Sequence, residues 1–300
     1  MRLHDDQIPS DPGLVRRLLA AQRPEWADRP VRRVDSTGTD NALFRLGDDL
    51  VARLPLRPSS TGPIEREHRW LPVLAPRLPL PIPVPLALGE PSDEFPFPWS
   101  VYPWLAGDDA TVAPLDPARA ARDLGRFVAA LHAVDGLDAG PRPSAANYGR
   151  GVPLAERDRS TRHSTAEAAA AGLADGPAVT AVWDEALAAP PWDGPPVWLH
   201  GDIAAGNLLV RDGRIAAVID WGTMGVGDPA CDLIVAWELF AGADREAFRA
   251  EVGVDDATWL RGRGWAVSTA IGALPYYQHT NPFMADQARR KIAALVGAAS

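Results

Sequence analysis

The sequence predicts an α+β protein with two lobes, a small β-rich N-terminal lobe and a larger, mainly helical C-terminal lobe. Apolar and polar residues alternate over 42–54, which is typical of a β-hairpin. Further along the chain apolar residues recur at helical spacing, and one β interruption at 197–219 breaks this half. We therefore expect an N-terminal lobe over residues 1–104, a hinge at about 101–107 and a C-terminal lobe over 105–300, with a cleft between the lobes.

Local signals place the first elements. Asp11 and Pro12 are a capping residue and a first-turn proline ahead of three leucines at helical spacing, which predicts a short opening helix. Strands at 42–46 and 50–54 follow, joined by a Gly-Asp-Asp turn.

The rest of the N-terminal lobe is expected to contain one helix and one strand. The helix begins at Gly62 and runs to about Ala75. Residues 76–91 are rich in proline, which forbids a helix and favours extended or edge structure. The strand covers 99–105 and is stopped by Pro103.

Capping signals also mark the C-terminal lobe. Helices are expected after Asp116, after Pro177, after Asp228, near Asp256 and after Asn281. The β interruption consists of short apolar runs at 197–199, 207–210 and 215–219, and an Asp-Gly turn joins the last two into a hairpin.

The basic residues exclude several classes of enzyme. Of the 30 Lys and Arg residues only Lys291 is a lysine. A Walker A loop requires a lysine in the body of the chain, so a P-loop NTPase is excluded. Pyridoxal-phosphate enzymes and lysine-dependent aldolases are excluded for the same reason.

Net charge and composition limit the kinds of molecule that the protein is expected to bind. The formal charge of -9, without a block of like charges, offers no basic patch for nucleic acid. The acid excess is compatible with a cationic substrate, although it also keeps ordinary soluble proteins dispersed. Cys231 is the only cysteine, and the sequence has neither a signal-peptide core nor an apolar run of membrane length. We therefore expect a cytoplasmic protein that acts on a small molecule, with its oligomeric state left open.

The residues that indicate chemistry lie in the β interruption. His200-Gly201-Asp202 is followed by Asn207 and then by Asp220-Trp221-Gly222. This is the spacing of the protein-kinase catalytic loop and of its Asp-Phe-Gly motif, with glycine in place of the loop arginine. Phosphoryl transfer needs a carboxylate that accepts the proton of the attacking hydroxyl, and oxygen ligands for Mg²⁺. Because these residues border one strand and one hairpin, we expect them to meet at one rim.

These motifs resemble the aminoglycoside phosphotransferase family, which are small-molecule kinases with a protein-kinase-like fold. The resemblance extends to four further segments, at residues 38–41, 51–55, 104–107 and 227–233. The first three stand where the family has its phosphate loop, its third strand and its interlobe hinge, so roughly residues 30 to 280 are covered. The resemblance implies that Asp202 is the catalytic base, that Asn207 and Asp220 bind Mg²⁺, and that ATP or GTP is the phosphate donor.

In protein kinases a strand lysine grips the phosphates and a helix glutamate holds it. Here the strand carries Arg53, which is permanently charged and binds phosphate well. Glu67 lies on the apolar stripe of the expected helix, where a buried acid needs a partner, whereas Glu65 has the spacing of a surface ion pair with Arg69. We therefore predict that Glu67 pairs with Arg53, and Glu65 remains the alternative.

The remaining nucleotide contacts are predicted from position. Gly38 and Thr39 belong to the loop between the first two strands, where backbone N–H groups cradle phosphates, although an ordinary turn has the same composition. The hinge, with Tyr102 and Trp104, is expected to offer backbone groups to the edge of the base.

Three further polar residues have competing interpretations. His200 is either a general base or a residue that orders the loop through a backbone hydrogen bond, and we favour the second role. Asp228 precedes Pro229 and has the signature of a helix N-cap. Asp232 lies one turn later and is left out of the site.

Three functions remain to be distinguished. The first is a nucleotide-dependent kinase that phosphorylates a hydroxyl of an aminoglycoside-like molecule or, on the same fold, of a macrolide, sugar, choline or methylthioribose. The second is a metal-dependent hydrolase, which the scarcity of paired histidines disfavours. The third is a silent nucleotide-binding module, against which the retention of Asp202, Asn207 and Asp220 argues.

Overall fold

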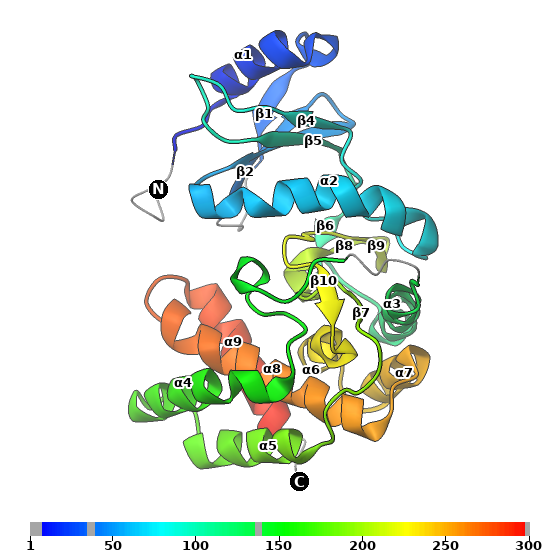
Figure 1. Cartoon of the computed structure of the whole chain (residues 1–300), viewed down its shortest axis with the longest axis vertical. Coiled ribbons are helices and arrows are strands. Elements are labelled where there is room, and N and C mark those ends of the chain that lie inside the picture. The colour runs from blue at the N-terminus through cyan, green and yellow to red at the C-terminus, as the bar shows by residue number, and fades with distance from the viewer. Residues whose placement is uncertain (1–7, 35–39, 136–139, 298–300) are drawn as a thin grey trace.

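A five-stranded antiparallel sheet forms the N-terminal lobe of the computed structural model, which describes residues 8–34, 40–135 and 140–297 (Figure 1). The strands lie in the order β1-β2-β3-β5-β4. They are β1 (Val31–Arg33), β2 (Asn41–Leu46), β3 (Leu50–Pro55), β4 (Ala87–Gly89) and β5 (Trp99–Pro103). The proline-rich segment begins within a short 3₁₀ helix at Ala75–Arg77, which the sequence did not predict, and supplies the edge strand β4, as its composition predicts.

Alternation along the β2–β3 hairpin separates the two faces of the sheet. Ala52 and Leu54 are fully buried in a cluster that includes leucines of α1 (Pro12–Gln22). The side chain of Arg53 points to the opposite face because successive strand residues alternate. Leu43 is its cross-strand partner in the register. The alternation therefore directs Arg53 away from the α1 side of the sheet.

Helix α2 (Gly62–Leu74) lies between the sheet and the C-terminal lobe (Figure 1). Its buried residues include Glu67, Leu71 and Leu74, the stripe that the sequence predicts. The ring of Trp70 packs on that of Trp198 in the C-terminal lobe, with centroids 5.0 Å apart. Helix α2 thus contributes to the packing of both lobes, and the boundary near residue 104 stays a prediction.

The C-terminal lobe is mainly helical. Its helices are α3 (Pro117–His132), α4 (Asp158–Ala170), α5 (Gly176–Ala188), α6 (Ala236–Leu239), α7 (Gly242–Val252), α8 (Asp256–Tyr277) and α9 (Pro282–Gly297). Its strands are β6 (Asp108–Asp109), β7 (Val197–Leu199), β8 (Leu208–Arg211), β9 (Arg214–Val218) and β10 (Gly225–Gly227). The β8–β9 hairpin lies beneath α2 (Figure 1).

The elements of the C-terminal lobe differ from expectation in several places. The segment after Asp228 begins as a 3₁₀ helix over Pro229–Val235 before the short α6, rather than as one α-helix. Helices α4 and α7 and the short strands β6 and β10 were not among the expected elements. Helix α4 is mostly polar and only its Thr161, Thr165 and Ala168 are buried, so its apolar signal is weak.

Within the described part of the chain, none of the helices combines the length and the apolar character that a membrane span requires.

Candidate active site

The candidate catalytic loop connects β7 to β8. Asp202 lies in this loop with its side chain 44% exposed, and its Oδ1 accepts a hydrogen bond of 2.9 Å from Nη2 of Arg150. The amide Nδ2 of Asn207 donates to the backbone oxygen of Asp202 over 2.9 Å. The carboxylate is therefore oriented by a neighbouring cation while it stays open to a ligand.

His200 has both ring nitrogens occupied by the backbone. Its Nδ1 accepts the N–H of Asp202 at 3.2 Å, and its Nε2 lies 3.0 Å from the carbonyl oxygen of Ile219, to which it donates. These partners fix a neutral imidazole with the proton on Nε2. The ring is fully buried against Trp221, with centroids 4.6 Å apart. This geometry supports the ordering role over that of a base.

Backbone bonds bring Asp220 to the same rim. The N–H of Ile219 donates to the backbone oxygen of Asn207 over 2.9 Å, which ties the residue before Asp220 to the catalytic loop. Asp220 itself adopts a left-handed backbone conformation with φ of 62°, and its side chain is exposed. The structure therefore brings Asp202, Asn207 and Asp220 together, as their spacing predicts.

The donor set at this rim fits Mg²⁺ held partly by a nucleotide. Because Asn207 uses its amide nitrogen on Asp202, its amide oxygen is free to act as a ligand beside the carboxylate of Asp220. Mg²⁺ is usually held by one or two protein carboxylates together with phosphate oxygens and water. Among the described residues no group of three or more His, Cys, Asp or Glu could hold a metal by itself. Two oxygen ligands and open positions are what a nucleotide-bound ion requires.

Arg53 and Glu67 form a buried pair across from this rim. Nη1 of Arg53 lies 2.8 and 2.9 Å from the two carboxylate oxygens of Glu67, whose side chain is 1% exposed. The hydroxyl of Tyr102 donates to Glu67 as well. With its amide turned toward the guanidinium, Asn41 accepts from Nε and Nη2 of Arg53 at 3.1 and 3.2 Å. Glu65 is exposed and takes no part in the pair.

The charge of Arg53 is fixed by these neighbours. Burial alone would lower the pKa of Arg53, but the negative charges of Glu67 and Asp220 and the nearby Tyr102 outweigh it and raise the pKa. Burial and Glu67 likewise raise the pKa of Tyr102, so its hydroxyl stays a donor. Asp220 is thus one of the negative charges that keep the guanidinium positive.

The structure supports the other predicted nucleotide contacts less than it supports Arg53 and Glu67. Gly38 and Thr39 lie outside the described residues. In the hinge, the N–H of Trp104 already donates to the backbone oxygen of Asp49 over 2.7 Å, and its ring stacks on Arg45 at 4.0 Å. The backbone N–H of Trp104 is thus not free for a base, and the role of Tyr102 in binding one stays a prediction.

Two positioning residues escaped the sequence interpretation. Asp232 is fully buried, and its two oxygens accept the backbone N–H groups of His200 (3.0 Å) and Gly201 (2.7 Å). Arg150 reaches Asp202 from a loop far earlier in the chain. From the sequence alone Asp232 is considered but left out of the site. No sequence signal joins Arg150 to the catalytic loop.

Asp228 performs the structural role that its position predicts. Its Oδ1 accepts the N–H of Ala230 at 3.0 Å, as an N-cap does. Both of its oxygens also bind the guanidinium of Arg261, at 2.8 and 3.2 Å, and both side chains are 3% exposed.

Replacing Asp232 with asparagine is expected to destabilise the protein by about 1–3 kcal/mol and to lower kcat, because one backbone N–H would face an NH₂ group instead of an oxygen. Denaturant unfolding and nucleotide titration measure the two effects. Nucleotide affinity should change little, and Asp193→Asn in an exposed loop is the matched control. Unchanged stability and kcat would show that Asp232 does not hold the loop.

The two lobes, the kinase-like catalytic loop and the opposing Arg–Glu pair define a phosphotransferase of the protein-kinase-like class. The profile of the Phosphotransferase enzyme family matches residues 31–265, and the chain belongs to this family. This membership confirms the predicted class of enzyme.

Known proteins resemble the chain to different extents. Aminoglycoside 3'-phosphotransferase from Escherichia coli is 35% identical over 78 residues, which are 25% of this chain and only 29% of that protein. Macrolide 2'-phosphotransferase MphH from Brachybacterium faecium is 28% identical, with a TM-score of 0.64 over 96% of this chain and 98% of that one. APH(2")-IIia, solved with GDP and kanamycin, has a TM-score of 0.71 at 18% identity and covers 94% and 98% of the two chains. These likenesses confirm the predicted bilobal fold class.

Proposed function

We propose that the chain is a kinase that transfers the γ-phosphate of ATP or GTP, with Mg²⁺, to a hydroxyl group of a small molecule. The observation that carries this proposal is the geometry of the catalytic loop together with the buried Arg53–Glu67 pair. In the loop Asn207 bonds Asp202, and the N–H of Ile219 ties the residue before Asp220 to Asn207. The nucleotide in the structure of APH(2")-IIia is GDP, which supports a nucleotide as the donor. A cytoplasmic location, and the absence of nucleic-acid and membrane partners, belong to the same proposal.

The residues divide the work of the reaction. Asp202 orients the acceptor hydroxyl and takes its proton, while Arg150 holds the carboxylate in place. Glu67 and Asn41 hold the guanidinium of Arg53, which binds the phosphates. Mg²⁺ held at Asn207 and Asp220 would supply charge neutralisation at the transferring phosphate.

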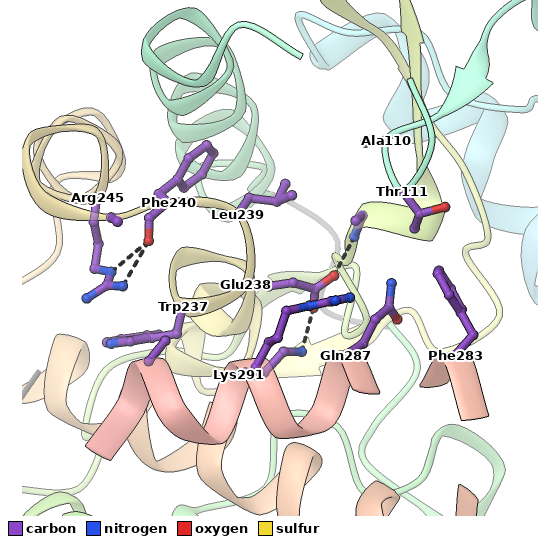
Figure 2. Close-up of a pocket in the computed structure, with 14 residues that line it drawn as sticks. Ala110, Thr111, Trp237, Glu238, Leu239, Phe240, Arg245, Phe283, Gln287 and Lys291 are labelled. Carbon is purple, nitrogen blue, oxygen red and sulfur yellow. Dashed lines mark hydrogen bonds and ion pairs between the residues drawn. The ribbon is translucent and has the colours of Figure 1, made fainter. Parts of the chain in front are cut away.

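A pocket in the C-terminal lobe is suited to receive the acceptor. It has a volume of about 360 Å³, within the range of about 300–1,000 Å³ that small-molecule sites occupy. Ala205 of the catalytic loop forms one wall, and α6 and α9 form others (Figure 2). Trp237 and Glu238 of α6 line the pocket, whereas Tyr276 and Tyr277 at the end of α8 do not.

A metal-dependent hydrolase is the second candidate, since His200, Asp202, Asp220 and Asp228 are all polar residues of this region. The geometry disfavours it because His200 is bonded to the backbone through both nitrogens and Asp228 is engaged by Arg261. Neither side chain has an atom left for a catalytic metal.

Formation of the nucleoside diphosphate, ADP or GDP, from ATP or GTP tests the proposal. The wild-type protein is incubated with Mg²⁺, each nucleotide and a panel of aminoglycosides, macrolides, sugars and small alcohols. We expect formation of ADP or GDP that depends on an acceptor and is abolished when a chelator removes Mg²⁺. Esterase or amidase activity that zinc restores without nucleotide would contradict the kinase and favour the hydrolase.

A further inference from the structure

The charge of the acceptor pocket differs from that of the whole chain. Four charged side chains are found among the described residues that line it: Glu238, Arg245, Arg290 and Lys291. Three bases therefore face one acid, although the chain has a formal charge of -9. The overall acid excess says nothing in favour of a cationic acceptor at this place, because a bound molecule responds to the charges that surround it.

The one acid of the pocket is already neutralised. Oε1 of Glu238 accepts the backbone N–H of Ala205 at 2.7 Å, and Oε2 lies 2.5 Å from Nζ of Lys291 (Figure 2). The side chains of Lys291 and Glu238 are 13% and 12% exposed, so the pair is largely shielded from water. The only lysine of the chain thus occupies the carboxylate that an ammonium group of a substrate would need.

The remaining cations of the pocket have different partners. Nε and Nη2 of Arg245 donate to the backbone oxygen of Phe240 at 3.1 and 2.8 Å, and Glu246, which does not line the pocket, is the nearby acid that acts on its charge. Arg290 pairs with Asp286 on the exposed side of α9. Among the described residues that line the pocket, no acid is therefore left unpaired for an ammonium group of a polycationic ligand.

The rest of the lining offers an apolar surface with a few polar groups. Trp237, Leu239, Phe240 and Phe283 contribute large apolar side chains, and Figure 2 shows Gln287 beside Phe283. Such a surface binds the apolar body of a ligand and directs a small number of hydroxyl groups.

We propose that the acceptor is a neutral or acidic hydroxyl compound with an apolar body, and that the Lys291–Glu238 pair excludes polycations such as kanamycin. This inference rests on the proposed function, because it takes this pocket as the acceptor site. It assigns the lone lysine a role in substrate selection rather than in nucleotide binding.

Calorimetric titration of kanamycin, without nucleotide, tests the exclusion separately from catalysis. We expect weak binding to the wild type and at least about tenfold tighter binding to Lys291→Met, because a partly buried carboxylate becomes available to an ammonium group. Adding Glu238→Gln to Lys291→Met should remove the gain, since the amide still accepts from Ala205 but has no charge. Arg289→Met, at an exposed position of α9 outside the pocket, is the matched control.

The outcomes separate this inference from the proposed function. Equal kanamycin affinity in wild type and Lys291→Met, or kanamycin as a better substrate than neutral hydroxyl compounds, would overturn the inference while leaving the kinase proposal intact. If Lys291→Met does not fold, Lys291→Gln gives the same comparison. Failure of every acceptor to promote formation of ADP or GDP would instead count against the proposed function.

Discussion

Replacing Asp202 with asparagine is expected to lower kcat by about 10²–10⁴-fold while nucleotide affinity stays unchanged, because a general base typically contributes that factor. Asparagine has nearly the same shape and can still accept the bond from Arg150, but it cannot take a proton. Steady-state kinetics give kcat, and nucleotide titration gives the dissociation constant.

Asp212→Asn is the matched control for this variant, since Asp212 lies exposed in the turn of the β8–β9 hairpin. A rate for Asp202→Asn within tenfold of wild type, about 1.4 kcal/mol in barrier height, would contradict the assignment of the base. Loss of nucleotide binding in parallel would indicate a collapsed loop instead of a missing base.

Replacing Arg53 with alanine is expected to weaken nucleotide binding and to destabilise the fold by about 3–5 kcal/mol, because Glu67 would remain buried without its partner. Arg53→Lys should weaken binding less, since it keeps the charge but loses the planar guanidinium. The raised pKa of Arg53 means that the guanidinium is charged at neutral pH. Nucleotide titration and denaturant unfolding measure the two effects.

A double variant separates the two effects of Arg53. In Arg53→Ala with Glu67→Ala no buried charge is left alone, so stability should recover while nucleotide affinity stays low. Arg32→Ala on the neighbouring part of the sheet is the control, since that side chain is 69% exposed. Equal nucleotide affinity for wild type, Arg53→Ala and Arg53→Lys would show that Arg53 does not bind the phosphates.

Features set by neighbouring residues could be predicted from the sequence. The opening helix follows from the Asp11 cap, whose Oδ1 accepts the N–H of Leu14 at 2.8 Å. The buried stripe of α2 follows from spacing, and it placed Glu67 where Arg53 could reach it. Asp202, Asn207 and Asp220 meet because a strand end and a short hairpin carry them.

Features that depend on distant contacts could not be predicted. Arg150 is 52 residues from Asp202 and comes from a loop without regular structure. β10 pairs with β7 across the intervening hairpin. Lys291 and Glu238 meet only because α9 packs beside α6, which no local pattern of either segment specifies.

The hinge shows a third kind of limit. The end of β5 at Pro103 was predictable from the sequence, whereas the hinge itself stays a prediction and the use of individual N–H groups could not be predicted. The strand register aligns Leu50 with Pro103, which leaves the N–H of Trp104 to bond the oxygen of Asp49. Which backbone atoms remain for a base is therefore decided by strand pairing, which sequence patterns do not specify at single-residue precision.

Phosphorus NMR of the reaction products tests the central claim most directly. The wild-type protein is incubated with Mg²⁺, the preferred nucleotide and an acceptor that promotes formation of ADP or GDP. We expect a phosphomonoester on the acceptor, in an amount equal to that of the nucleoside diphosphate formed. The same mixture with Asp202→Asn should give almost none. If inorganic phosphate and the nucleoside diphosphate are the only phosphorus products and the acceptor is unchanged, the assignment of this chain as a small-molecule kinase is contradicted.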